Sequence, residues 1–188
     1  MKRFLGLSLC ALALAVAVPA SASTFIGLST DELVATSDAI VQGEVLQVHS
    51  FWSKSGRIIV TEAIVRVTET VAGKSPSAVI LRTFGGTVEG YTVEAHGFPK
   101  FEKGQELLLF VSNQKDGTAE VNGYRQGQYR IVRDKAGVEV AVPTVEHGVR
   151  LLNRDGSAAP APKALRLDNF KQMLRNAEIE RPGTRTAN

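Results

Sequence analysis

The sequence predicts an all-β domain with a minor helical part. Three observations support this fold class. Short apolar or alternating segments recur along the chain, turns rich in glycine, proline and aspartate separate them, and helical spacing occurs only near the two ends. Because no helices alternate with the strands, we expect a barrel or a sandwich and not a βαβ fold.

The first 22 residues are predicted to be a cleavable secretory signal peptide. Two basic residues open the chain, an apolar run follows at 4–18, and small residues at 20–22 suit a signal peptidase. The run is shorter than the about 20 residues that a membrane span requires. We therefore expect a periplasmic or secreted protein without a membrane span, cleaved near Ala22. An uncleaved anchor, or a lipoprotein modified at Cys10, fits the run length and the position of the cysteine less well.

Removal of the predicted signal changes the composition. Of the 188 residues 166 remain, with 20 basic and 19 acidic residues and no cysteine, so the formal net charge falls from +3 to +1. Such a chain offers no general attraction for nucleic acid. An exported protein without a disulfide depends on its core, which one domain of this size can supply. The absence of cysteine from an exported protein favours the bacterial envelope as its location.

Helices are predicted at both ends of the remaining chain. Ser29 and Glu32 form a capping box before apolar residues, which predicts a short helix at 30–37. Near the C-terminus, Asp168 is the expected N-cap of a second helix. The apolar residues of this second helix at helical spacing are Phe170, Met173, Leu174 and Ala177.

The first two strands are long. One is predicted at 39–49, and its apolar phase slips, which indicates a β-bulge near Gly43. Val41 and Val45 share one face of this strand, and Leu46 and Val48 take the other. The clearest strand is 57–71, whose length fits a bent strand at a barrel corner. Its apolar face holds Ile59, Ala63, Val65, Val67 and Val71.

A turn at 72–76 leads into a strand at 78–84. The glycine-rich segment 85–90 connects it to a strand at 91–95. This segment lacks the Lys-Ser/Thr ending and the following helix of a phosphate loop, so we interpret it as a kinked or bulged barrel corner. Residues 97–104 are loop.

The continuous apolar run 107–111 predicts a central strand buried on both faces. The Asp-Gly pair at 116–117 should open a hairpin. A further strand pair is predicted at 129–132 and 138–142, and the segment 158–162 is linker-like. Together these elements predict a five- to seven-stranded barrel of the oligonucleotide/oligosaccharide-binding (OB) type, with a short N-terminal helix and a C-terminal helix.

The chain divides accordingly into four expected segments. These are the signal peptide at 1–22, the barrel domain at 23–145, a C-terminal extension at 146–180 with a helix packed on the barrel, and a flexible tail at 181–188.

Three motifs carry a resemblance to a known family. The run 37–45, the end of the long strand at 71–74, and the run 101–110 resemble the netrin-like barrel, the fold of the N-terminal domain of tissue inhibitors of metalloproteinases. The chain also resembles a family of small exported bacterial proteins of unassigned activity, some encoded near matrixin-like metalloproteases. The resemblance covers about 29–132. It implies a protein-binding role, although the cysteine with which the animal inhibitors chelate zinc has no counterpart in the mature chain.

Catalytic motifs are not found in the sequence, and we expect no enzyme and no cofactor or metal. The three histidines lie far apart, no Gly-x-Ser-x-Gly elbow is present, and the lone cysteine leaves with the signal. The acid–histidine pairs 94–96 and 146–147 are more simply solvated loop residues. Tyr124-Arg125 and Tyr129-Arg130 could form a stacking platform for single strands, but alternation places Tyr129 in the core.

Two functions remain. The first is a protein-binding module, possible partners being other exported proteins and, in the sharpest form, a zinc metalloprotease. Cleavage after Ala22 would expose an amine at Ser23 that, with its carbonyl, could fill the open position of a catalytic zinc. The candidate contact residues are Ser23, Thr24, Phe25, Phe51, Trp52, Phe98 and Phe101. The alternative is an envelope module for a glycan or a small molecule, which predicts an exposed aromatic row beside polar groups.

Overall fold

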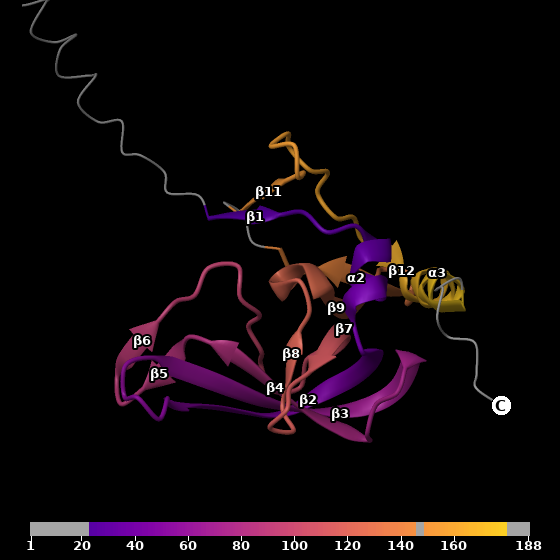
Figure 1. The fold of residues 1–188 in the computed structure, drawn as a ribbon. Helices are drawn as coiled ribbons and strands as arrows, with labels where there is room; N and C mark the ends of the chain where they lie inside the picture. Colours follow the sequence, from indigo (N-terminus) through magenta and orange to yellow (C-terminus); the bar gives the residue numbers. More distant parts are fainter. Residues whose placement is uncertain (1–22, 146–148, 180–188) are drawn as a thin grey trace, which may run out of the picture.

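Five strands form a closed mixed barrel in the computed structural model, which describes residues 23–145 and 149–179 (Figure 1). The strands are β2 (Ala39–Trp52), β3 (Ile59–Gly73), β4 (Ala78–Phe84), β8 (Ala119–Val121) and β7 (Glu106–Asn113), in that order around the ring. Neighbours are antiparallel except β4 and β8, which pair in parallel at Leu81 and Ala119. The predicted OB-type barrel is confirmed.

Bulges in β2 let the two long strands bend around the barrel. The pairing of β2 with β3 shifts register at three places, one of them between Gln42 and Gly43 as the sequence indicates. Another shift leaves Leu46 without a partner in β3, so Leu46 is 38% exposed while Val48 returns to the interior face. The prediction that Val48 shares the face of Leu46 is therefore wrong, because this second bulge reverses the alternation. At Gly43 the strands approach so closely that a Cβ would lie 2.4 Å from the Arg66 carbonyl oxygen.

The core has two parts, and β7 contributes to both. Leu107, Leu109 and Val111 point into the barrel, among the apolar residues of β2, β3 and β4. Leu108 and Phe110 point the other way, toward the helices. This double burial confirms the central strand that the continuous apolar run predicts.

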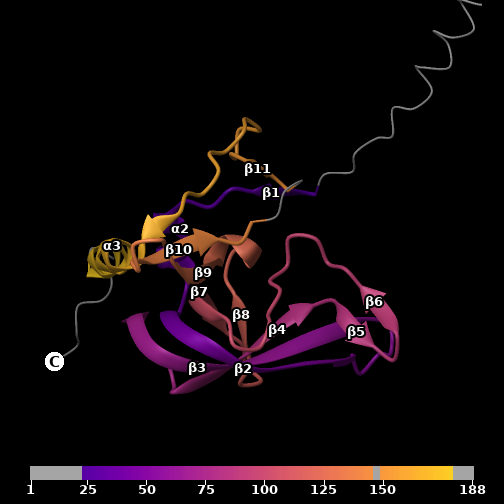
Figure 2. The same cartoon turned by 180° about the vertical axis from the view of Figure 1, so that it is seen from behind.

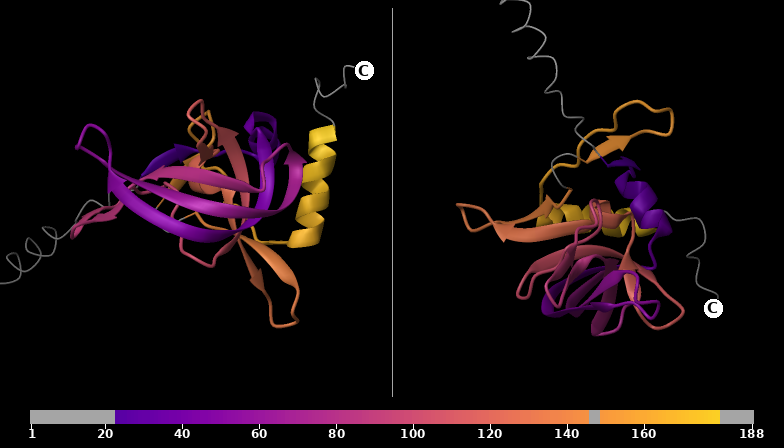
Figure 3. Two further views of the ribbon diagram at one scale, coloured as in Figure 1. Left: turned by 90° about the horizontal axis from the view of Figure 1, so that it is seen from below. Right: turned by 90° about the vertical axis from the view of Figure 1, so that its left-hand side faces the viewer.

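Two helices cover the second part of the core. Helix α2 (Thr30–Thr36) begins at the predicted capping box of Ser29 and Glu32. Helix α3 (Leu167–Ile179) lies across one end of the barrel, opposite the end that carries β5 and β6 (Figures 2 and 3). The ring of Phe170 meets that of Tyr129 at 4.9 Å between centroids, so Tyr129 belongs to the core as alternation predicts.

The remaining strands extend or flank the barrel. Strands β9 (Gln128–Arg133), β10 (Glu139–Pro143) and β12 (Leu165–Arg166) continue the sheet from β7. Strands β5 (Gly86–Val88) and β6 (Tyr91–Val93) form a two-stranded hairpin, and β1 (Thr24–Ile26) pairs in parallel with β11 (Arg150–Leu152). The glycine-rich segment is thus a separate hairpin and not only a bulged corner.

Three further local predictions are wrong. Phe51 and Trp52 end β2 and are not in a loop, because β3 pairs with β2 as far as Trp52. Asp168 is not the N-cap of α3, since the helix begins at Leu167. Met173 is 43% exposed, because the buried side of α3 is set by Leu167, Phe170 and Leu174.

The predicted signal peptide and the predicted tail at 181–188 lie outside the described residues. Within the described ranges, no helix has both the length and the apolar character to cross a membrane.

An ion-pair cluster ties α3 to β3. Lys171 Nζ donates to Glu69 Oε2 at 2.8 Å and to Gln42 Oε1 at 3.0 Å, and Arg175 also pairs with Glu69. The Lys171 side chain is only 12% exposed. Chiefly through the hydrogen bond from Lys171, the cluster lowers the pKa of Glu69 below its usual value of 4.5.

We expect Glu69→Gln to lower the free energy of unfolding by about 1–2 kcal/mol at pH 7, because Lys171 loses its counter-charge at a mostly buried position. A lowered carboxyl pKa contributes stability that is present above the unfolded pKa and lost as pH falls through the folded pKa. The difference from the parent should therefore shrink as pH falls below about 4.5. Urea denaturation of the parent and the variant from pH 7 to pH 3 measures this difference in the free energy of unfolding. A difference that does not change with pH would contradict the ion pair.

Candidate functional site

A row of four aromatic side chains crosses the surface near the end of β4. Successive ring centroids lie 5.2 Å apart for Phe84 and Phe98, 4.9 Å for Phe98 and Tyr124, and 5.5 Å for Tyr124 and Phe25. We call these four residues the aromatic row. They come from β4, the loop between β6 and β7, the 3₁₀ helix η2 (Tyr124–Gly127), and β1. Phe84 and Tyr124 are 48% and 44% exposed, so the row is open to solvent.

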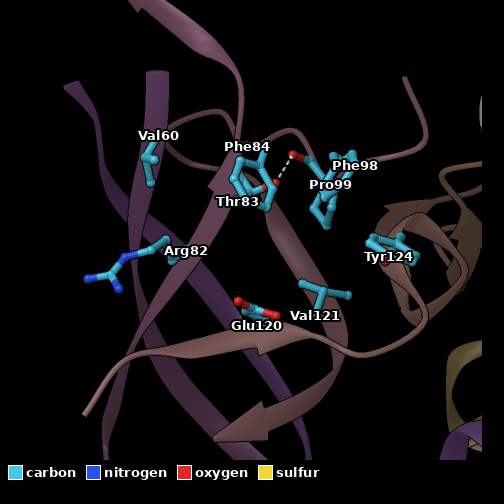
Figure 4. A pocket seen from close by; sticks show the side chains of 9 residues that line it. All are labelled: Val60, Arg82, Thr83, Phe84, Phe98, Pro99, Glu120, Val121 and Tyr124. Atoms are coloured by element: carbon cyan, nitrogen blue, oxygen red, sulfur yellow. Dashed lines mark hydrogen bonds between the residues drawn. The ribbon is translucent and has the colours of Figure 1, made fainter. Parts of the chain in front are cut away.

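Three members of the row line a groove of about 160 Å³ (Figure 4). Phe84, Phe98 and Tyr124 form its aromatic wall, and Val60 and Val121 add aliphatic surface. The remaining lining residues are Arg82, Thr83, Pro99 and Glu120. The groove is therefore mainly apolar, with charged groups along one side.

Strand register explains why these residues meet. Val60 pairs with Phe84, and Phe51 pairs with Val60 on the other side, so the three side chains share the outer face of the sheet. Strand β8 lies beside β4, and η2 begins after two further residues, which brings Tyr124 into the row beside Phe98.

The Arg82 guanidinium is held by two carboxylates. Its Nε and Nη2 donate to Glu62 Oε1 at 3.1 and 2.7 Å, and its Nη1 donates to Asp116 Oδ2 at 2.6 Å. These bonds, first that to Glu62, raise the pKa of Arg82. The pKa of Asp116 is lowered, first by the hydroxyl of Thr118 and then by Arg82. Figure 4 shows the guanidinium directed away from the aromatic wall.

Unusual backbone conformations place two members of the row. Tyr124 has a φ of 57°, in the left-handed region where a non-glycine residue is uncommon. Gly97 has a φ of 82°, and a Cβ there would lie 2.3 Å from Phe25 Cζ, so only glycine lets the Phe25 ring approach. The Arg125 amide donates to the Gly97 carbonyl at 3.1 Å, which joins η2 to the loop.

Buried polar side chains hold the segments around the row. Gln126 Oε1 accepts from the Leu28 amide at 2.8 Å, and Gln126 Nε2 donates to the Ile26 carbonyl at 3.0 Å. These two bonds fix the chain next to β1. Thr83 Oγ1 donates to the Pro99 carbonyl at 3.2 Å, which fixes the loop after Phe98. Such satisfied buried groups rigidify the surface that they support.

The structure separates the residues predicted as contacts. Phe25 and Phe98 both belong to the aromatic row, and Ser23 and Thr24 lead directly into Phe25. The Ser23 carbonyl already accepts a hydrogen bond from the Arg150 amide at 2.9 Å.

The other predicted contact residues do not belong to the aromatic row, and only Phe51 lies on the face of the sheet that carries the groove. Phe51 is on the groove face of the sheet, beside Val60. Trp52 points to the opposite face and meets Tyr91 of the β5–β6 hairpin at 6.1 Å between ring centroids. Phe101 is 8% exposed and packs in the barrel core, so it offers no contact surface.

Sequence reasoning misses Phe84, Arg82 and Glu120 as site residues, and it considers Tyr124 only for nucleic acid. The signal for Phe84 is its alternation with Leu81 and Thr83, which point inward. That pattern places Phe84 outside, where an aromatic residue is informative. Nothing in the sequence places Glu120 near it, because β8 reaches β4 only through barrel closure.

A second cavity of about 280 Å³ lies beside the β5–β6 hairpin. Its wall includes the hydroxyls of Ser50 and Thr61, 2.7 Å apart, and those of Thr87 and Thr92, 2.9 Å apart. Across residues 23–145 and 149–179, no three histidine, cysteine or acidic side chains cluster so that they could hold a metal ion. The pair at 146–147 lies outside these ranges.

The fold and the site together define a small closed β-barrel with flanking helices and an exposed aromatic row. A scan against protein-family models and a search of the curated proteins both give no match for this chain.

Because Tyr124 has a left-handed backbone, we expect glycine to be more stable than alanine at this position, the reverse of the order in an extended strand. The free energy of unfolding of Tyr124→Gly should be about 1 kcal/mol higher than that of Tyr124→Ala. Alanine keeps the strain of the left-handed backbone, which glycine relieves. At Tyr129, in extended backbone, Tyr129→Gly should instead be less stable than Tyr129→Ala. Chemical denaturation of the four variants checks both orders, and the same order at the two sites would contradict the strain at Tyr124.

Proposed function

We propose that this chain is an exported, non-enzymatic protein-binding module of the netrin-like type, and that the aromatic row is its contact surface. The exposure of Phe84 and Tyr124 carries the proposal. Aromatic residues and arginine dominate the binding energy of protein interfaces, particularly around a pocket that a partner side chain can fill. Here three members of the row form one wall of such a groove, with Arg82 fixed at its edge.

A flat stacking platform is less well supported. The Phe84 and Phe98 rings meet at 85°, and the Phe98 and Tyr124 rings at 72°. Rings at such angles form the walls of a pocket and not one plane on which sugar rings or bases could stack. This geometry favours an inserted side chain over a glycan on the row.

A zinc metalloprotease is the sharpest candidate partner. The segment at Ser23 continues through Phe25 into the aromatic row, so a partner seated on the row would also lie near the predicted new N-terminus. Chelation through the Ser23 carbonyl would have to compete with its bond from the Arg150 amide.

A glycan or small polar molecule is the second candidate ligand, and the cavity beside the β5–β6 hairpin is the observation that favours it. Its paired hydroxyls give a polar wall in the mouth of a barrel, where small ligands often bind.

Substitutions at two exposed positions test whether the aromatic row is the contact surface. We expect Phe84→Ala and Tyr124→Ala each to weaken capture of a protein partner from the secreted fraction by roughly tenfold or more, since each removes a large contact side chain. Met173→Ala, similarly exposed but on α3, is the matched control and should capture normally. Immobilised mature protein and quantitative mass spectrometry measure this. Equal capture by all variants would remove the row as the contact surface.

The zinc mechanism has its own test. The mature chain beginning at Ser23 should inhibit a secreted zinc protease, and a variant with one residue added before Ser23 should inhibit it about tenfold or more less, because the amine moves away from the metal. Peptide-cleavage assays measure the inhibition constants. Equal inhibition by both proteins, or none by either, would exclude chelation by the Ser23 amine while leaving binding through the row untouched.

A further inference from the structure

The groove beside the aromatic row combines aromatic walls with a carboxylate that has no partner among the described residues. Glu120 lies in β8 and lines the groove together with Phe84, Phe98 and Tyr124 (Figure 4). Its side chain makes no ion pair or hydrogen bond with any residue of the described part of the chain. It is exposed, so its charge remains solvated until a partner covers the groove.

The cation that lines the groove does not neutralise Glu120. Arg82 is the one cation among the groove-lining residues, and each of its three guanidinium nitrogens already donates to Glu62 or Asp116. Only Glu120 and Arg82 of these four side chains line the groove, but Glu62 and Asp116 offset the charge of Arg82, so the four together carry a net charge of −2. The groove therefore favours a cation over an anion or a neutral apolar group.

The aromatic walls add to this preference. The face of an aromatic ring carries a negative electrostatic potential that attracts a cation within about 6 Å of the ring centre. Because the rings of Phe84, Phe98 and Tyr124 are mutually inclined by 85° and 72°, they present surfaces from different directions. Val60 and Val121 supply aliphatic surface for a methylene stem, as long basic side chains require.

We propose that the groove binds a lysine or arginine side chain of the protein partner, with its charge between Glu120 and the rings of the aromatic row and its stem packed against Val60 and Val121. This inference rests on the proposed function, and it specifies the chemistry of the partner. The volume of about 160 Å³ suits one side chain. Arg82 acts as a positioning residue, because its bonds to Glu62 and Asp116 hold β3, β4 and the β7–β8 turn together on that side of the groove.

Short peptides test the inference without a known partner. The probes are acetyl-Ala-Lys-Ala-amide, its arginine analogue, and the norleucine analogue, which keeps the stem and lacks the charge. They are titrated into the mature chain and followed by amide chemical shifts in NMR. We expect millimolar binding of the basic peptides, shifts centred on residues 84, 98, 121 and 124, and binding of the norleucine peptide that is roughly fivefold or more weaker.

Glu120→Gln should weaken binding of the basic peptides by roughly threefold to tenfold and leave the norleucine peptide unaffected. Glu106→Gln is the matched control, because Glu106 is an exposed glutamate of β7 away from the groove. Equal binding of lysine and norleucine peptides, or unchanged binding by Glu120→Gln, would overturn the inference.

These outcomes are separable from those of the partner capture. If the basic peptides fail to bind while Phe84→Ala still loses its partner, the row is a contact surface but not a cation site. If the peptides bind as expected while capture is insensitive to the row, the cation site stands and the proposed function fails.

Discussion

The parallel pairing of Leu81 with Ala119 is the constraint on which the rest of the structure depends. It joins β8 to β4, and because β8 also pairs with β7, this one contact closes the ring of five strands. Closure buries the inner face of β7, and the helices cover its other face, so β7 lies between the two parts of the core. It also decides where η2 lies, since η2 follows β8 after two residues. The aromatic row is therefore a consequence of barrel closure.

The side chains around the groove show how a small domain without disulfides keeps such a surface in place. Arg82 bridges two segments through Glu62 and Asp116, and Gln126 holds the chain beside β1 through both ends of its amide. Surface ion pairs of this kind contribute little to stability one by one. Their value here is positional, because they fix segments that are distant in sequence. The left-handed Tyr124 follows the same logic, since strain of about 1–3 kcal/mol persists only where neighbours impose it.

The groove and the N-terminal segment form one continuous surface with two distinct chemistries. At one end, Phe25 leads from Ser23, where the predicted cleavage would create an amine. At the other end, Glu120 offers a charge to a basic side chain. A partner that has a basic loop next to a zinc centre would contact both ends of this surface. A partner with only one of these features would contact one end. The hydroxyl-lined cavity near Ser50 is separate from both.

The sequence by itself determined most of the local structure. Alternation and turn residues placed seven strands within a few residues, the capping box at Ser29 began α2 correctly, and the slipped phase near Gly43 revealed a bulge. The short strands β1, β5, β11 and β12 were not predicted. These features depend on neighbouring residues, so they are visible in a linear pattern. The tertiary structure alone decided the site. Phe84, Glu120 and Tyr124 meet because β4 and β8 pair across almost forty residues of chain, and no local pattern encodes that pairing.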